Sequence, residues 1–214
     1  MTPQTLEPSN LQTQAMRSYY RFQSRIYDAT RWSFLFGRRR ILDKMQPLPA
    51  GSTMLEVGCG TGYNLRSLAR RHPQAQLTGI DISADMIRIA GRKTTRFPHV
   101  RLLEKAYGSE GDIEPGSVDA ILFSYSLTMI NPQWPEILLR AQRDLRPGGR
   151  MYIVDFHSSR VGWFRRHMAH HHVRMEGHFD DFLESHFSTL EKTIMPAYGG
   201  LWHYFFYVGE KPAR

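Results

Sequence analysis

A regular alternation of short apolar strands with amphipathic helices begins near residue 54 and limits the folds open to this chain more than any other feature. Strands are predicted at residues 54–58, 76–81, 100–105, 118–124 and 150–156, and helices at 62–72, 83–94 and 135–146, with Ser83 as the N-cap of the second helix. Strands that alternate with helices of this length form βαβ units around a parallel sheet. After a short helix at 179–187, two strands at 188–197 and 202–209 are expected to form a hairpin. We therefore expect an α/β fold with a seven-stranded, mostly parallel sheet, an antiparallel C-terminal strand and helices on both faces.

Length and composition favour one globular domain. The chain has 214 residues, of which 41% are hydrophobic and 22% are charged, and these values suit a folded chain with a sizeable core. Residues 1–46 are predicted to form a basic, aromatic N-terminal cap segment that ends in a short helix at 37–46. Residues 47–214 are predicted to form the α/β body, and both parts together are expected to make a single domain.

The net charge of +8 is confined to two segments. Residues 1–50 hold eight Arg or Lys and three acids, and residues 157–178 hold four Arg and one acid, while the rest of the chain is neutral. Both segments also contain aromatic residues, and rings mixed with cations suit an anionic membrane surface. The alternative is that the rings pack in the core and the cations are solvated. The cations expected to face lipid are Arg38, Arg39, Arg40, Lys44, Arg165 and Arg166.

Cysteine usage and hydropathy favour a cytoplasmic protein. Cys59 is the single cysteine, which excludes an internal disulfide and fits a reducing compartment. No run of about 18 apolar residues suggests a spanning helix, and the N-terminus lacks the apolar stretch of a signal peptide. We expect a cytoplasmic protein that is peripheral at the inner face of the membrane.

A glycine-rich segment closes the first predicted strand and opens the first predicted helix. It reads Glu56-Val-Gly58-Cys59-Gly60-Thr-Gly62. Glycine lets the backbone turn sharply and lets a ligand approach it closely, and the unpaired N–H groups of the following helix attract electron-rich groups. Asp81 ends the second strand, where an acid can bind ribose hydroxyls. A strand, a glycine turn, a helix and an acidic strand end together predict a nucleotide-like ligand.

This E-x-G-x-G-x-G pattern resembles the first motif of class I S-adenosylmethionine-dependent methyltransferases, which share a Rossmann-like sheet. Asp81-Ile82-Ser83 with Met86, and the Pro147-Gly148-Gly149 turn before the fifth strand, resemble later parts of the same pattern. The resemblance covers about residues 50–156 and implies S-adenosyl-L-methionine as the cofactor. The alternative is a Rossmann-like domain that binds another nucleotide or none.

The resemblance also implies residues for the ribose and adenine of the cofactor. Asp81 would bind both ribose hydroxyls, and Ile82 or Met86 would pack on the adenine. Many relatives have an acid and a small residue after the third strand, whereas this chain has Lys105 and Ala106 there. The Ala106 backbone would then meet the adenine without an acidic contact from position 105.

The methionine end and the methyl group are implied to lie along the glycine turn and the fourth strand. Glu56 would order the turn or reach the cofactor ammonium through water, and Ser124 would lie near the methyl with Tyr125 beside it. The turn residues implied to approach the methionine part are Gly58, Cys59, Gly60 and Gly62.

The flanks indicate the methyl acceptor. YDATRW at residues 27–32, FLFGR at 34–38 and YFFYVGEKP at 204–212 resemble bacterial betaine-lipid N-methyltransferases, which methylate the amine of diacylglyceryl-homoserine, and related phosphatidylethanolamine N-methyltransferases. An amine-bearing lipid and an anionic membrane surface are therefore the expected partners. A soluble small-molecule methyltransferase and a non-catalytic binding protein stay as alternatives. Nucleic acid is not expected as a partner, because no appended RNA-binding module is visible.

Five histidines between residues 167 and 178 raise the question of a metal. His167 and His171 have the i, i+4 spacing of two ligands on one helix face. No cysteine or nearby pair of carboxylates completes a ligand set, so we expect a partly protonated, basic helix and no metal.

A nitrogen acceptor must lose a proton before it attacks a methyl group. An amine with a pKa of about 10, like that of lysine, needs a base or water to take that proton. Tyr20, Tyr27 and His157 are the predicted catalytic residues, on the grounds of side-chain type and of position near the expected cofactor. Tyrosine rings also suit the methylated ammonium through cation–π attraction.

Overall fold

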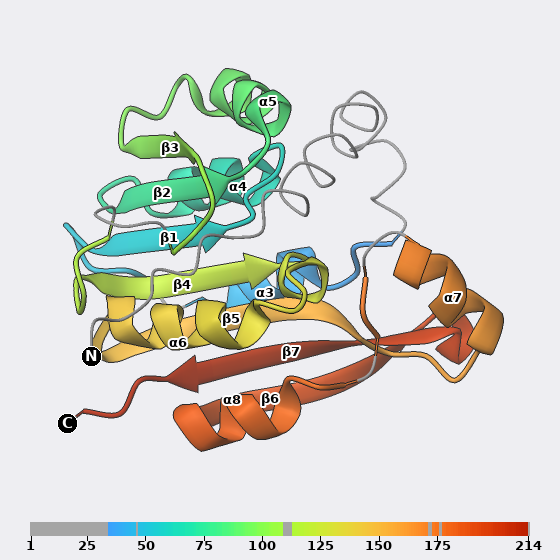
Figure 1. The fold of residues 1–214 in the computed structure, drawn as a ribbon. Coiled ribbons are helices and arrows are strands. Elements are labelled where there is room, and N and C mark those ends of the chain that lie inside the picture. The colour runs from blue at the N-terminus through green and yellow to red at the C-terminus, as the bar shows by residue number, and fades with distance from the viewer. Residues whose placement is uncertain (1–33, 46, 109–112, 171–172, 176, 214) are drawn as a thin grey trace, which may run out of the picture.

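Seven strands form one sheet in a computed structural model that describes residues 34–213 except 46, 109–112, 171–172 and 176. The sheet order is β3-β2-β1-β4-β5-β7-β6 (Figure 1). Neighbouring strands from β3 to β5 pair in parallel, and β7 runs antiparallel to both β5 and β6. The predicted sheet with one antiparallel C-terminal strand is therefore confirmed. The strands are β1 (Thr53–Val57), β2 (Gln76–Asp81), β3 (Val100–Glu104), β4 (Val118–Ser124), β5 (Leu145–Ser158), β6 (Ser188–Ala197) and β7 (Trp202–Glu210).

Helices cover both faces of the sheet. One face carries α3 (Arg38–Lys44), α4 (Tyr63–Arg71) and α5 (Ala84–Thr94), and the opposite face carries α6 (Trp134–Asp144) and α8 (Asp180–His186) (Figure 1). The helix α7 (Gly162–His170) covers the sheet end at which β5 finishes and β7 begins. Two short 3₁₀ turns complete the described elements, η1 (Leu127–Met129) and η2 (Tyr198–Gly200).

Alternation along the strands divides the core into two layers. In β5, Tyr152 and Val154 face α3 and α4, whereas Met151 and Ile153 face α6 and α8. Successive side chains of a strand point to opposite faces, so a sheet covered on both sides is apolar at nearly every position. Ile41 on α3 is fully buried in the first layer, which makes this part of the N-terminal segment integral to the core.

The structure differs from the sequence prediction mainly around β5. This strand begins at Leu145, which pairs with Val118, rather than at residue 150. The register shifts between Val118 and Ala120, and Gly148 takes a φ of +72°. The expected turn at Pro147-Gly148-Gly149 is therefore an irregularity inside the strand, and α6 ends two residues earlier than predicted.

Candidate cofactor site

The glycine-rich turn joins β1 to α4 at the carboxyl end of the sheet. Gly58, Gly60 and Gly62 all have positive φ, at +71°, +53° and +73°. A Cβ on Gly58 would lie 2.6 Å from Cβ of Ser126, and one on Gly62 would lie 2.9 Å from Cβ of Ala90, whereas a Cβ on Gly60 would meet no atom of the described residues within 4 Å. Two of the glycines are thus required for packing, and the third faces open space where a ligand can approach the backbone.

Asp81 ties this turn to the start of α5. One carboxylate oxygen accepts from Gly60 N at 2.8 Å, and the other accepts from Ser83 N at 2.9 Å. Ser83 then caps α5 as predicted, because its side chain accepts from Met86 N at 3.4 Å. Burial raises the pKa of Asp81, and the two backbone N–H groups act against that rise. Each oxygen keeps a lone-pair site with which to accept a ribose hydroxyl.

A buried carboxyl lies directly beneath the turn. Glu56 is 1% exposed, and its Oε1 accepts from Asn64 Nδ2 at 2.7 Å. Among the described residues, Glu56 Oε2 and Asn64 Oδ1 are buried and have no hydrogen-bond partner. Burial raises the pKa of Glu56 to about 7. Two buried acceptors without donors are costly, so this position suits a ligand that brings several N–H groups.

The adenine side of the expected site is formed by the segments after β2 and β3. Ile82 is partly exposed, whereas Met86 is fully buried in the core, so Ile82 offers the surface on which a ring can pack. Lys105 N donates to the carbonyl of Asp81 at 2.9 Å, which brings the end of β3 beside Asp81. Ala106 follows and is partly exposed.

The side chain of Ser124, at the end of β4, points to the same face of the sheet as that of Glu56. Ser124 is partly exposed, and its Oγ is buried and has no hydrogen-bond partner among the described residues. Tyr125 has a φ of +57° and turns back under the N-terminal segment, where its hydroxyl donates to the carbonyl of Phe36 at 2.7 Å. Ser124 therefore has the more open side chain of this predicted pair.

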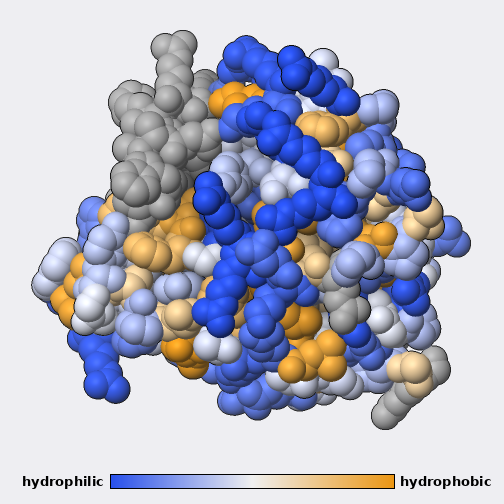
Figure 2. All heavy atoms as spheres, turned by 180° about the vertical axis from the view of Figure 1, so that it is seen from behind, coloured by the Kyte–Doolittle hydropathy of each residue, from blue (hydrophilic) through white to orange (hydrophobic). Residues whose placement is uncertain are grey.

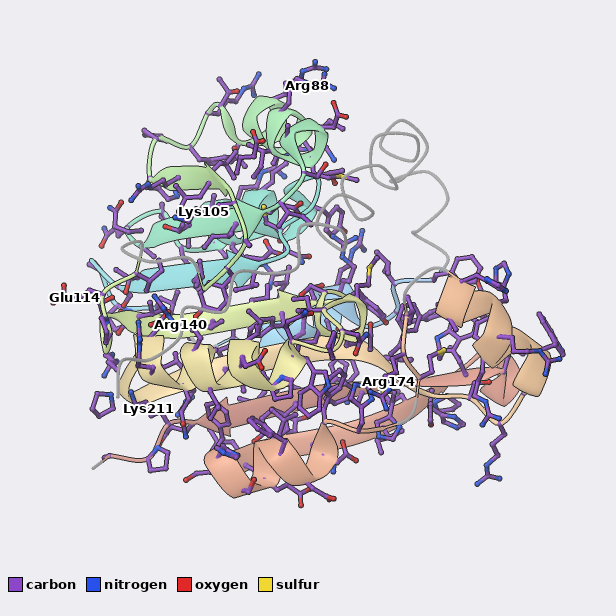
Figure 3. All side chains as sticks on the ribbon, viewed as in Figure 1. Arg88, Lys105, Glu114, Arg140, Arg174 and Lys211 are labelled. Carbon is purple, nitrogen blue, oxygen red and sulfur yellow. The ribbon has the colours of Figure 1, made fainter. Side chains whose placement is uncertain are left out.

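Asp155 on β5 fixes the turn that follows β4. Its carboxylate is fully buried and accepts from the backbone of Leu127 at 2.9 Å and from the hydroxyl of Thr128 at 2.5 Å. Arg174 N donates to the carbonyl of Thr128 at 3.1 Å, so Arg174 lies beside this turn (Figure 3). Burial raises the pKa of Asp155 to about 6. No sequence motif identifies Asp155, because an acid inside an apolar strand has no pattern of its own.

Of the three predicted catalytic residues, the structure describes His157. Tyr20 and Tyr27 lie outside the described residues. His157 lies on the sheet face opposite Glu56, where its ring packs 5.8 Å from Phe205. Its two ring nitrogens contact Ser158 Oγ at 3.1 Å and Asp180 Oδ2 at 3.2 Å. His157 is therefore held in a polar contact with α8, and its catalytic role stays a prediction.

Two of the cations expected to face lipid also contact protein groups. Arg40 packs 5.0 Å over the ring of Phe206, and Lys44 forms an ion pair with Glu191 at 2.9 Å. Their face of the molecule carries strongly hydrophilic side chains across its centre, with hydrophobic ones between them (Figure 2).

Comparisons with known proteins agree with the geometry of the site. Residues 54–149 match a methyltransferase domain family. The demethylmenaquinone methyltransferase of Tropheryma whipplei is 34% identical over 152 residues, which are 67% of this chain and 60% of that protein. The trans-aconitate 2-methyltransferase of Deinococcus radiodurans is 36% identical over 116 residues, which are 53% of this chain and 42% of that protein. This chain thus spans less than two thirds of the length of either relative.

The fold has counterparts among solved structures. Phosphoethanolamine N-methyltransferase 2 of Haemonchus contortus, solved in complex with S-adenosyl-L-methionine, superposes with a TM-score of 0.76 at 19% identity over 92% of this chain and 60% of that one. The orphan acceptors at Glu56 and Asn64 and the open space above Gly60 fit that cofactor. Residues 54–149 therefore match a methyltransferase domain, and the chain shares the fold of a methyltransferase solved with S-adenosylmethionine.

Proposed function

We propose that this protein is an N-methyltransferase that acts on the amine of a lipid head group at an anionic membrane surface, with diacylglyceryl-homoserine as the substrate and a betaine lipid as the product. The observation that carries this proposal is the outer surface of α7. Trp163 is 61% exposed, the highest value among the large hydrophobic side chains described. Arg165 and Arg166 follow it and are exposed, and α7 contains no acid.

Aromatic packing on the inner side of α7 holds this helix against the rest of the protein. Phe164 stacks on Trp202 at 5.2 Å, and Phe34 stacks on Trp202 at 5.5 Å. Tyr198, which is 55% exposed, packs 4.9 Å from the same ring. An apolar anchor therefore holds the helix while an exposed tryptophan and two cations face outward, an arrangement that suits the boundary between head groups and acyl chains. Among the described residues, no helix is long and apolar enough to cross a membrane.

Vesicle binding tests this surface. The double substitution Arg165→Ser and Arg166→Ser is expected to weaken binding to vesicles that contain phosphatidylglycerol by about 30-fold, because each cation near such a surface contributes about 1 kcal/mol. The matched control is Arg92→Ser with Arg96→Ser, which removes one exposed cation in the last turn of α5 and one just beyond that helix. Co-sedimentation measures the affinity. Equal losses in both variants, or none in either, would exclude α7 as the docking surface.

Each part of the cofactor has a proposed partner in the site. Glu56 accepts from the cofactor ammonium, Asp81 accepts from the ribose hydroxyls, and Ile82 packs on the adenine. When bound, S-adenosylmethionine supplies a methyl group on a sulfonium, which is already activated for displacement. The protein then has to align the acceptor nitrogen with that methyl and keep the nitrogen unprotonated. Ser124, at the end of β4, is proposed to lie beside the acceptor.

Removal of the amine proton is assigned to Tyr20, Tyr27 or His157. Tyr20→Phe, Tyr27→Phe and His157→Ala are each made, and turnover is measured from pH 6 to 9. Loss of a general base lowers the rate by about 10²–10⁴-fold, so at least one variant is expected to show such a loss. Asp180→Asn serves as the companion of His157→Ala, because Asp180 contacts the His157 ring. Near wild-type rates in all three variants would remove these residues from the mechanism.

Partition of labelled methyl groups tests the acceptor class. The protein is incubated with methyl-labelled S-adenosylmethionine, a total lipid extract and, separately, the aqueous metabolite fraction. We expect label in the organic phase. A soluble small-molecule methyltransferase is the second candidate, and trans-aconitate 2-methyltransferase among the relatives favours it. Label in water-soluble material alone would support that candidate and contradict the lipid proposal.

A further inference from the structure

The helix α3 brings one guanidinium beside the glycine-rich turn. Gly37 precedes α3 with a φ of +77°, and a Cβ there would lie 2.4 Å from the ring of Phe206 on β7. The helix therefore starts in close contact with the sheet. From this position Cζ of Arg38 lies 4.2 Å from the ring centroid of Tyr63. Tyr63 is the first residue of α4 and follows the last glycine of the turn, so Arg38 lies at the point where the turn becomes a helix.

Arg38 and Glu56 carry opposite charges and interact electrostatically beside the glycine-rich turn. The positive charge of Arg38 lowers the pKa of Glu56 and so opposes the effect of burial. Arg38 is partly buried, unlike its exposed neighbours Arg39 and Arg40. Beneath the turn, the acceptors Glu56 Oε2 and Asn64 Oδ1 have no donor among the described residues. A cation and two acceptor oxygens thus lie around one end of the site.

We propose that Arg38 binds the carboxylate of the amino-acid end of S-adenosylmethionine, while Glu56 and Asn64 accept hydrogen bonds from the ammonium of the same end. The planar fork of a guanidinium matches a carboxylate with two parallel hydrogen bonds. The ammonium has three donors for the two orphan acceptors. The carboxylate then faces the positive charge of Arg38, and the ammonium faces the acceptors of Glu56 and Asn64. This assignment concerns the cofactor and holds for any methyl acceptor.

The alternative role of Arg38 is structural, because it stacks on Tyr63 and offsets the charge of Glu56. The two roles differ in what they predict for a cofactor without a carboxylate. If Arg38 binds the carboxylate, its removal weakens binding of S-adenosylmethionine and leaves binding of decarboxylated S-adenosylmethionine unchanged. If Arg38 only supports the fold or the charge of Glu56, its removal affects both ligands equally.

Calorimetry on the full chain measures this difference. For Arg38→Ala we expect S-adenosylmethionine to bind about 10- to 100-fold more weakly, the range for a hydrogen bond between charged groups, with no change for the decarboxylated compound. Arg38→Lys should recover part of the loss. The control is Arg39→Ala, which removes an exposed cation one residue along α3 and should affect neither ligand. Equal losses for both ligands with Arg38→Ala, or no loss for either, would overturn the proposal. Both ligands are measured on one variant, so partial unfolding weakens both alike.

Discussion

Replacing Glu56 by Gln is expected to stabilise the ligand-free protein and to weaken cofactor binding. Glu56 has a pKa of about 7 in the folded protein, against an ordinary value of 4.5, so the folded state holds a proton that the unfolded state has lost between these pH values. The free energy of unfolding therefore falls as pH rises from about 4.5 to 7 and stays low above 7. The cost of ionising this buried group is about 3 kcal/mol. Glu56→Gln removes that cost and keeps an acceptor for Asn64.

Cofactor binding should change in the opposite direction. In the wild-type protein, affinity should increase as pH rises towards 7, because Glu56 becomes a carboxylate that attracts the ammonium. It should fall again near pH 8, where a free α-amino group loses its charge. Glu56→Gln should lose about 10- to 100-fold in affinity at pH 7.5 and should no longer gain affinity between pH 5.5 and 7.

Urea unfolding and calorimetry check both halves of this prediction. The control is Glu114→Gln, which removes an exposed acid on the loop before β4 (Figure 3) and should change neither quantity. A variant that is more stable and binds the cofactor normally would show that Glu56 is a strained structural residue without contact to the cofactor. A variant that is less stable would contradict the raised pKa.

Alanine at two glycines of the same turn should separate binding from folding. At Gly60 a Cβ meets no atom within 4 Å in the part of the chain that the structure describes. The cost to folding is therefore that of a left-handed alanine, about 1–2 kcal/mol. The new methyl occupies the space above the turn, and we expect at least a tenfold loss of affinity for S-adenosylhomocysteine. At Gly62 a Cβ would lie 2.9 Å from Cβ of Ala90 and 3.0 Å from its Cα. That overpacking adds about 1–3 kcal/mol of destabilisation.

Thermal unfolding without ligand and calorimetry with S-adenosylhomocysteine measure the two effects. Gly60→Ala should lower Tm by only a few degrees. Relative to that loss of Tm, its affinity for S-adenosylhomocysteine should fall more than that of Gly62→Ala. Gly62→Ala should show the larger loss of Tm. If Gly60→Ala bound S-adenosylhomocysteine like the wild type, the cofactor would not lie over this turn.

Local patterns predicted most of the fold. Strands β2, β4 and β6 have the predicted limits, and Ser83 caps α5 as expected. Each of these elements has its own signal, such as a period of two, a capping side chain or a flanking glycine. The start of β5 was misplaced, because Pro147-Gly148-Gly149 reads as a turn. The pairing of Leu145 with Val118 depends on a strand far away in the chain.

The site was predictable where it is made of backbone and motif. The sequence placed Glu56, the glycines and Asp81 correctly at the ends of β1 and β2. It assigns no cofactor role to Asn64 or Arg38, because the contacts of Asn64 with Glu56 and of Arg38 with Tyr63 depend on how α4 and α3 pack. The cations of α3 were expected to face lipid as a group. The contact of Arg40 with Phe206 and the ion pair of Lys44 with Glu191 depend on tertiary packing, which charge patterning does not report.

Mass spectrometry of a defined reaction tests the proposed function most directly. The protein is incubated with S-adenosylmethionine and vesicles that contain phosphatidylglycerol and purified diacylglyceryl-homoserine, and the extracted lipid is fragmented to locate any added methyl. We predict methyl groups on the head-group nitrogen, with the yield reduced in Arg165→Ser/Arg166→Ser. An unmodified lipid, from a preparation that binds S-adenosylmethionine and methylates a water-soluble acceptor, would contradict the lipid assignment.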